Sequence, residues 1–232
     1  MTGKEQTMHN EKLQEIKDKL FAFSALASSM VEKGTRAIVT KDEALAKEVV
    51  DVDEPMANEF DHAIERETIN FIALYQPEAR TLRSVYMYAK IGTDLERLAD
   101  HGVNIAESAQ YLIARPDIKP YIDIPRMSEE ARKMLADAMT AFSTQNTRLA
   151  IDVVERDDIV DQLGNQIFRE LLTYMMADPS TIDRSLQILF VSGNLERVAD
   201  LATNIAEDVV FATTGRLIRH NRLSKEELDK LR

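Results

Sequence analysis

Residues Leu95–Glu107 read LERLADHGVNIAE, and residues Leu195–Glu207 read LERVADLATNIAE. Nine of the thirteen positions are identical, and they include every Glu, Arg, Asp and Asn of the segment. The two segments are separated by 195 − 95 = 100 residues. A match of this quality at a fixed spacing indicates an internal repeat, in which each half of the chain forms the same structural unit.

Both segments have the spacing of an amphipathic helix. At about 100° per residue, the leucines and isoleucines gather on one side and the polar residues on the other. The polar side therefore forms an acidic stripe that points away from the core. Its members are Glu96, Asp100, Asn104 and Glu107 in the first copy and Glu196, Asp200, Asn204 and Glu207 in the second.

The rest of the sequence predicts an all-α protein. Gly and Pro number only 7 and 6 among 232 residues, so tight turns are few and long helices are favoured. With three helices in each half, the expected fold is two tandem three-helix bundles related by the repeat. The expected helices are 8–50 with a break near Asp42, 55–75, 79–113, 129–152, 158–177 and 181–214.

Proline placement divides the chain. Three of the six prolines fall within residues 115–127, where they prevent a continuous helix. We therefore expect a first bundle over 1–114, a Pro-rich linker over 115–127 and a second bundle over 128–216. A C-terminal tail, 217–232, contains the capping-box pattern Ser224–Glu227 of a short helix.

Composition excludes several classes of function. The chain has 29 Lys+Arg and 40 Asp+Glu, a net charge of −11, which opposes binding to nucleic acid. Without cysteine it has no disulfide, thiolate metal site or cysteine nucleophile. The longest stretch without charged residues, Leu20–Val31, falls short of the roughly 20 residues of a transmembrane helix. With no signal-like start, we expect a cytoplasmic protein.

The acidic stripes predict metal sites. Two carboxylates at i, i+4 repel each other by about 0.2–0.5 kcal/mol, yet this spacing occurs in both copies, and a cation between them would remove the repulsion. A weaker match at an offset of 103 aligns two further polar series on the preceding helix of each half. These are Glu54, Asn58 and His62, and Asp157, Asp161 and Asn165.

Together the two helices of each half would offer four to six ligands, mostly oxygen. Because the second and third helices of a three-helix unit are neighbours, the polar series would face the acidic stripes. Oxygen ligands suit hard or borderline cations, so iron, manganese and magnesium are the candidates. An open site on the surface is also compatible with a multinuclear cluster.

Two alternatives to this interpretation remain. Arg97 and Arg197 are placed to pair with the aspartates at i, i+3, and the protein would then be a metal-free helical scaffold. Glu59-x-x-His62 has the form of one ligand element of ferritin-like di-iron proteins, which need it twice, and a metal storage or oxidase protein would follow.

Other candidates for chemistry are weak. The chain has no Gly-rich phosphate loop, nucleophile elbow or His-Glu-x-x-His motif, so we expect no enzyme. His101 leaves the acidic stripe, and its counterpart is Leu201, so a structural role is favoured. His220 and the arginines around it form a small basic patch of the tail.

At these motifs the sequence resembles the PhoU family, accessory proteins of bacterial phosphate uptake and signalling. The resemblance covers nearly the whole chain. It is carried by the segments Glu96–Ile105, Glu196–Ile205, Val153–Asp161, Tyr75–Arg83 and the ending GRLIRH.

The resemblance implies two tandem three-helix bundles with metal clusters, iron foremost, on Glu(Asp)-x-x-x-Asp motifs. By position the ligands would be Glu54, Asn58, Glu96 and Asp100, and Asp157, Asp161, Glu196 and Asp200. Asn58 departs from the pattern, because an amide replaces the carboxylate. The first site would then be weaker, differently occupied, or completed by His62.

The resemblance also implies a role and partners. PhoU proteins are negative regulators of the phosphate response that link the transporter ATPase to a membrane-bound sensor histidine kinase. Such a protein would reach the membrane only through its partners, and a homodimer is compatible with this role. Neither the metal, the oligomeric state nor the docking surfaces follow from the sequence.

Overall fold

The computed structural model describes residues 3–215, and every regular element in that range is helical. The prediction of an all-α fold is therefore confirmed. In chain order the elements are α1 (Gly3–Thr40), α2 (Glu43–Glu48), the π-helical η1 (Val49–Asp53), α3 (Glu54–Tyr75), α4 (Ala79–Ile113), α5 (Asp123–Thr144), α6 (Thr147–Ala177), the 3₁₀ turn η2 (Pro179–Thr181) and α7 (Ile182–Thr214).

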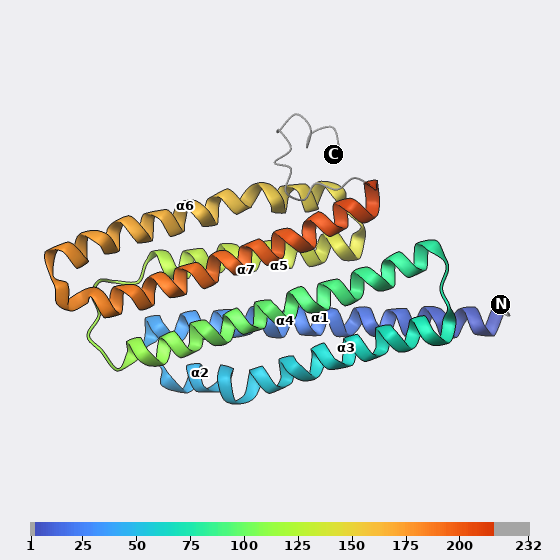
Figure 1. The fold of residues 1–232 in the computed structure, drawn as a ribbon, viewed down its shortest axis with the longest axis horizontal. Helices are drawn as coiled ribbons and strands as arrows, with labels where there is room; N and C mark the ends of the chain where they lie inside the picture. The colour runs from blue at the N-terminus through green and yellow to red at the C-terminus, as the bar shows by residue number, and fades with distance from the viewer. Residues whose placement is uncertain (1–2, 216–232) are drawn as a thin grey trace.

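The long helices form two three-helix units that lie side by side (Figure 1). In the first unit α1, α3 and α4 pack on one another, and in the second α5, α6 and α7 do the same. The units meet where α4 packs against α7 and α1 against α5. In Figure 1, α4 and α7 run in opposite directions at this junction. The predicted tandem of bundles is thus confirmed.

The first predicted helix is broken where the sequence indicated. Lys41 adopts a left-handed backbone with φ of 55°, and the Asp42 side chain accepts hydrogen bonds from the amides of Ala44 and Leu45, which starts α2. Behind the break, Lys33 of α1 pairs with buried Asp53 at 2.7 Å. This ion pair fixes the π-helical turn that leads into α3.

Other helix boundaries differ from the prediction. The first helix begins at Gly3 rather than residue 8. The fourth helix, expected over 129–152, runs from Asp123 to Thr144, since Pro125 falls in its first turn, where no backbone N–H is required. It ends because Gln145 is left-handed and Asn146 caps α6, accepting from the Leu149 amide at 3.1 Å.

The non-helical part of the predicted linker is therefore shorter than 115–127 and ends before Asp123. Its buried Lys119 pairs with Glu170 of α6, and Arg184 of α7 donates to the Pro116 carbonyl at 2.8 Å. The linker is thus held against the second unit. The expected tail 217–232, with its capping box and the patch around His220, lies outside the described residues.

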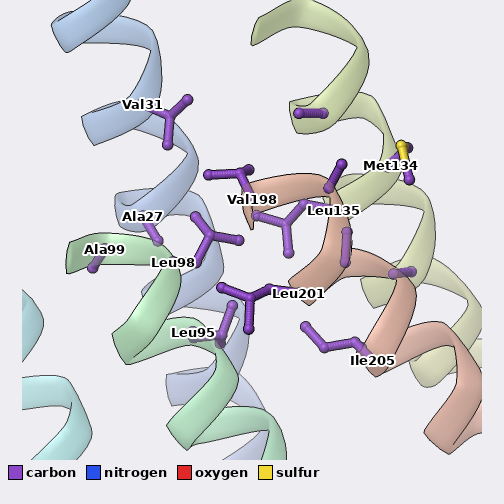
Figure 2. Packing of buried hydrophobic residues seen from close by; sticks show 14 of the residues in the cluster. Ala27, Val31, Leu95, Leu98, Ala99, Met134, Leu135, Val198, Leu201 and Ile205 are labelled. Carbon is purple, nitrogen blue, oxygen red and sulfur yellow. The ribbon is translucent and has the colours of Figure 1, made fainter. Parts of the chain in front are cut away.

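The two units share one hydrophobic core. Figure 2 shows leucines of α4 pointing toward apolar side chains of α7 at the junction. The buried residues drawn there are Ala27 and Val31 of α1, Leu95, Leu98 and Ala99 of α4, Met134 and Leu135 of α5, and Val198, Leu201 and Ile205 of α7. Burial of this apolar surface joins the units into one body.

Candidate metal centre

Four carboxylates gather on α6 and α7 of the second unit. Burial, together with the negative charges of Asp200, Asp161 and Asp158, raises the pKa of Asp157 to about 6. Burial and the charges of Asp161 and Asp200 also raise the pKa of Glu196, against the opposing charge of Arg197. The predicted set Asp157, Asp161, Glu196 and Asp200 therefore forms one electrostatically strained acidic cluster, which we call the α6/α7 cluster.

A glycine makes room for one of these carboxylates. A Cβ atom added to Gly164 of α6 would lie 1.9 Å from Oε1 of Glu196. Any larger residue at this position would therefore push the Glu196 side chain away. The absence of a side chain at Gly164 thus lets Glu196 lie beside Asp157 and Asp161 of α6. The sequence pattern did not indicate this feature.

In the first unit, the partner of Glu96 is a residue that the sequence analysis passed over. Burial raises the pKa of Glu96, and the charges of Asp100 and Asp61 raise it further. Asp61 lies on α3, and its own pKa is raised by burial and by Glu65. We call Asp61, Glu96 and Asp100 the α3/α4 cluster.

The two units bring similar residues together between their second and third helices. Asp61 lies near Glu96, as Asp161 lies near Glu196. Burial agrees with the expected offset of 103 between α3 and α6, because Ala57, Ile64 and Thr68 and their counterparts Val160, Ile167 and Leu171 are all buried. At this offset the counterpart of Asp61 is Gly164, beside which Glu196 lies.

The other predicted ligands of α3 lie at different angles from Asp61. Glu54 is half-buried at the first residue of α3, and Asn58 and His62 are exposed. Glu54 and Asn58 precede Asp61 by seven and three residues and share its face of the helix, whereas His62 is turned by about 100°. Glu59 is also exposed, so the Glu59-x-x-His62 element does not point into the core, as a ferritin-like centre requires.

The two repeated motifs open onto one cleft at the junction of the units. Its volume is about 730 Å³. Residues of both copies line it, together with Asp157 of α6: Arg97, Asp100, His101, Asn104, Arg197, Asp200, Leu201, Thr203, Asn204 and Glu207. Because α4 and α7 are antiparallel, the repeat brings Asp100 and Asp200 to the same opening. The sequence analysis had treated the two sites separately.

His101 connects the units at this cleft. Its Nδ1 lies 2.9 Å from Oδ1 of Asn194, which is itself buried. The side-chain amide of Asn194 donates to the Phe190 carbonyl at 2.8 Å, which fixes Oδ1 as the acceptor. The charge of His101 also acts on Asp200, where it opposes the effect of burial on the pKa. The predicted structural role of His101 is therefore supported by a specific bond.

The ion-pair alternative receives weak support. Arg197 lies 3.8 Å from Asp200, and the two side chains are 70% and 51% exposed. Exposed pairs of this kind contribute about 0–1 kcal/mol. The charge of Arg197 nevertheless lowers the pKa of Asp200 more than Asp161 raises it, so Arg197 offsets the repulsion at that residue, while burial keeps the pKa of Asp200 raised.

The remaining candidate ligands are dispersed around the clusters. The amide of Asn165 donates to the Asp161 carbonyl at 2.9 Å, and Glu107 is exposed on α4. Within residues 3–215, no three His, Asp or Glu side chains meet in a group that would hold a metal ion as they stand. The carboxylates line neighbouring helices, and a bound ion would have to draw them together.

Comparison with known proteins identifies the family. The family model described as "PhoU domain" matches the chain twice, over residues 22–109 and 124–209. These two matches coincide with the two three-helix units. The chain belongs to the PhoU family.

Curated relatives in this family resemble the protein over most of its length. A phosphate-specific transport system accessory protein PhoU homolog from Aquifex aeolicus is 38% identical over 93% of this chain and 97% of its own. A homolog from Caulobacter vibrioides is 40% identical over 89% of this chain and 90% of its own.

Solved PhoU structures have the same fold. The crystal structure of PhoU from Pseudomonas aeruginosa has a TM-score of 0.85 at 31% identity and covers 89% of this chain and 99% of that one. The phosphate transport system regulatory protein PhoU from Streptococcus pneumoniae has a TM-score of 0.81 at 27% identity, with coverages of 90% and 98%. None of the helices within residues 3–215 is long and apolar enough to cross a membrane.

Proposed function

We propose that this PhoU protein is a non-catalytic, cytoplasmic regulator of phosphate uptake and phosphate-starvation signalling. It acts as an adaptor between the ATPase of the phosphate transporter and the sensor histidine kinase that responds to phosphate scarcity. Whole-length similarity to accessory proteins of phosphate-specific transport systems supports the transport part of this role. The adaptor role follows from the family resemblance of the repeated motifs.

The acidic clusters are the proposed metal centres of this regulator. The observation that carries this proposal is the raised pKa of Asp157, Glu196 and Asp200, which reports carboxylates gathered at a cost in repulsion and burial. A divalent or trivalent cation would offset both costs. Gly164, which leaves room for Glu196, fits the same interpretation.

The donor set determines which metals suit these centres. Asp157, Asp161, Glu196 and Asp200 would hold ions in the second unit, and Asp61, Glu96 and Asp100 in the first. All are carboxylates, which favour iron, manganese or magnesium over softer metals. We favour iron in multinuclear clusters. The open cleft leaves coordination positions for water and a further anion.

A genetic experiment tests the regulatory role. The gene is deleted in the source organism, and a phosphate-starvation reporter is measured in phosphate-rich medium. We expect the reporter to be active despite ample phosphate, and expression of the intact chain to silence it again. A reporter that stays silent in the deletion strain would contradict the proposed role. If the protein is instead a metal-free scaffold, a chain carrying both Asp100→Asn and Asp200→Asn should silence the reporter in the deletion strain as well as the intact chain does.

A further inference from the structure

A strip of exposed apolar side chains follows the α6/α7 hairpin. Three lie on α6 at i, i+4 and i+8, and three on α7 at the same spacing, so each row occupies one face of its helix. Their exposed fractions run from 39% to 79%. The six residues, here called the hairpin strip, are Phe168, Leu172, Met176, Ile182, Leu186 and Phe190.

The two rows lie opposite each other. η2 joins the two helices into a hairpin, visible at the left of Figure 1. In this hairpin Met176 and Ile182 are equally distant from the turn, as are Leu172 and Leu186, and Phe168 and Phe190. The strip is therefore continuous across both helices. Isolated exposed apolar residues are normal, but a contiguous strip on a surface marks an interaction site.

The strip runs directly into the α6/α7 cluster. Along α6, Phe168 follows Asp161 by seven residues, two helical turns, and thus lies on the same face. Along α7, Glu196 follows Phe190 by six residues and is turned about 120° from it around the helix. From the tip of the hairpin toward its middle, this face of α6 therefore changes from apolar to acidic.

The first unit repeats this surface only in part. At offsets of 103 on α3 and 100 on α4, the counterparts of Phe168 and Phe190 are Glu65 and Lys90. Glu65 is exposed, and Lys90 is bonded to Asp208 of α7. The large apolar counterparts that remain exposed are Ile69, Leu82 and Tyr86. Among the described residues, the complete strip is therefore found in the second unit alone.

The negative charge of the chain indicates which kind of partner can cover the hairpin strip. A second copy docked in parallel would set two acidic clusters against each other. An antiparallel copy would turn its hairpin tip, where exposed Asp178 and Asp183 outnumber the half-buried Arg184, toward the cluster. At a net charge of −11 per chain, both arrangements are repulsive. A partner with apolar residues followed by basic ones has no such repulsion.

We infer that the hairpin strip and the metal-free α6/α7 cluster form a docking surface for an amphipathic helix of a partner protein, with its apolar face on the strip and a basic end at the free carboxylates. The inference rests on the adaptor role proposed above and names the surface and the chemistry of one partner. Apolar anchors at i, i+4 and i+7 are the usual contacts of a helix laid in such a groove.

A synthetic peptide tests this surface directly. The probe is a fluorescent helical peptide with leucine at i, i+4 and i+7 and lysine about 13 residues beyond the central leucine, which matches the distance from Leu172 to the acidic cluster along α6. Binding to the full chain is measured by anisotropy with chelator present, so that the carboxylates are free. We expect saturable binding that weakens as salt rises.

Matched variants distinguish binding at the hairpin strip from non-specific hydrophobic binding. Leu172→Glu/Leu186→Glu should weaken binding by about tenfold or more, whereas Ile69→Glu/Leu82→Glu, at similarly exposed positions of the first unit, should leave it within about twofold. A probe with glutamate in place of lysine should bind about tenfold more weakly. Circular dichroism checks that each variant remains helical.

Several outcomes would overturn the inference. They are no saturable binding, equal binding to both double variants, or equal binding of the glutamate probe. A dimer in sedimentation that Leu172→Glu/Leu186→Glu abolishes would show that a second copy covers the strip, and would also overturn it.

The cellular assay keeps this inference distinct from the proposed function. If deletion of the gene leaves the phosphate-starvation reporter silent, the regulatory role fails. If deletion activates the reporter but Leu172→Glu/Leu186→Glu silences it as well as the intact chain does, only the docking surface fails. We expect the double variant to leave the reporter active and the metal content of the protein unchanged.

Discussion

His101 of α4 donates a hydrogen bond from Nδ1 to Oδ1 of Asn194 on α7, over 2.9 Å, and this bond joins the two repeated units at the edge of the acidic cleft. The repeat itself is unequal here, since the counterpart of His101 is Leu201 and that of Asn194 is Asp94. The bond therefore stabilises the packing of one unit on the other, and it is not part of the repeated structure of either unit.

Replacing this histidine should destabilise the protein. His101→Leu would leave Oδ1 of buried Asn194 without its donor, which costs about 1–3 kcal/mol. The free energy of unfolding in urea measures the loss. His62→Leu, at an exposed position of α3, serves as the control and should stay within about 0.5 kcal/mol. Equal losses in the two variants would contradict a specific role for the bond.

Gly164→Ala should raise stability and lower metal affinity. Alanine is favoured over glycine inside a helix by up to about 1 kcal/mol. The added Cβ clashes with the flexible end of Glu196, whose Oε1 lies at 1.9 Å, and makes an ordinary contact with Cε of Met127 at 3.5 Å, so the Glu196 side chain moves away. Thermal unfolding and a Mn²⁺ titration measure the two effects.

Gly193→Ala is the matched control, because a Cβ there meets nothing within 4 Å. It should stabilise α7 without changing Mn²⁺ affinity. If Gly164→Ala binds Mn²⁺ as tightly as the control does, Glu196 is not a ligand.

The α6/α7 cluster should make the metal-free protein less stable as pH rises. A carboxyl whose pKa is raised on folding binds more protons in the folded state, so stability falls as pH increases through the interval between the two pKa values. For Asp157 this interval runs from 3.8 to about 6. Asp157→Asn should flatten this part of the profile.

At pH 7 without metal, Asp157→Asn should be more stable than the natural chain by on the order of 1 kcal/mol, after allowance for its partial exposure. Urea unfolding at several pH values measures the difference, with Asp51→Asn at an exposed position as control. If the free energy of unfolding depends on pH in the same way in Asp157→Asn and in the natural chain, ionised Asp157 does not destabilise the metal-free protein.

The two clusters should bind metal with different affinities. The α6/α7 cluster has four carboxylates and the α3/α4 cluster three, and fewer anionic ligands hold a hard cation more weakly. Titration with Mn²⁺ should therefore resolve two classes of site. Asp200→Asn should remove the tighter class, and Asp61→Asn the weaker one.

The same titration tests which residues of α3 belong to the first site. Asn58 lies three residues before Asp61 on the same face of α3, so Asn58→Asp should strengthen the weaker class. If Asn58→Asp leaves that class unchanged while Asp61→Asn removes it, Asn58 is not at the site.

The repeat was sufficient to predict the fold. Leu95–Glu107 and Leu195–Glu207 share helical spacing and polar positions, so one unit implied the other. The offset of 103 between the polar series of α3 and α6 agrees with the burial of Ile64 and its counterpart Ile167. The sequence analysis passed over Asp61, because its counterpart at this offset is Gly164, which has no side chain to compare with it.

Features that depend on contacts between helices were beyond the sequence. The shared cleft arises from the antiparallel packing of α4 on α7, which the pattern of one helix does not encode. Glu196 lies against Gly164, but nothing in the sequence distinguishes this glycine from any other residue inside a helix. The end of α5 at Gln145 depends on a left-handed residue and an asparagine cap within a polar stretch.

The central claim, that the acidic clusters of this PhoU protein hold metal ions, is tested most directly by elemental analysis of the chain purified without added metal. The natural chain is compared with a variant carrying Glu96→Gln, Asp100→Asn, Glu196→Gln and Asp200→Asn, whose helicity is checked in parallel. We expect several transition-metal atoms per natural chain, iron foremost, and almost none in the variant. A natural chain without metal, or equal metal in the two proteins, would contradict the claim.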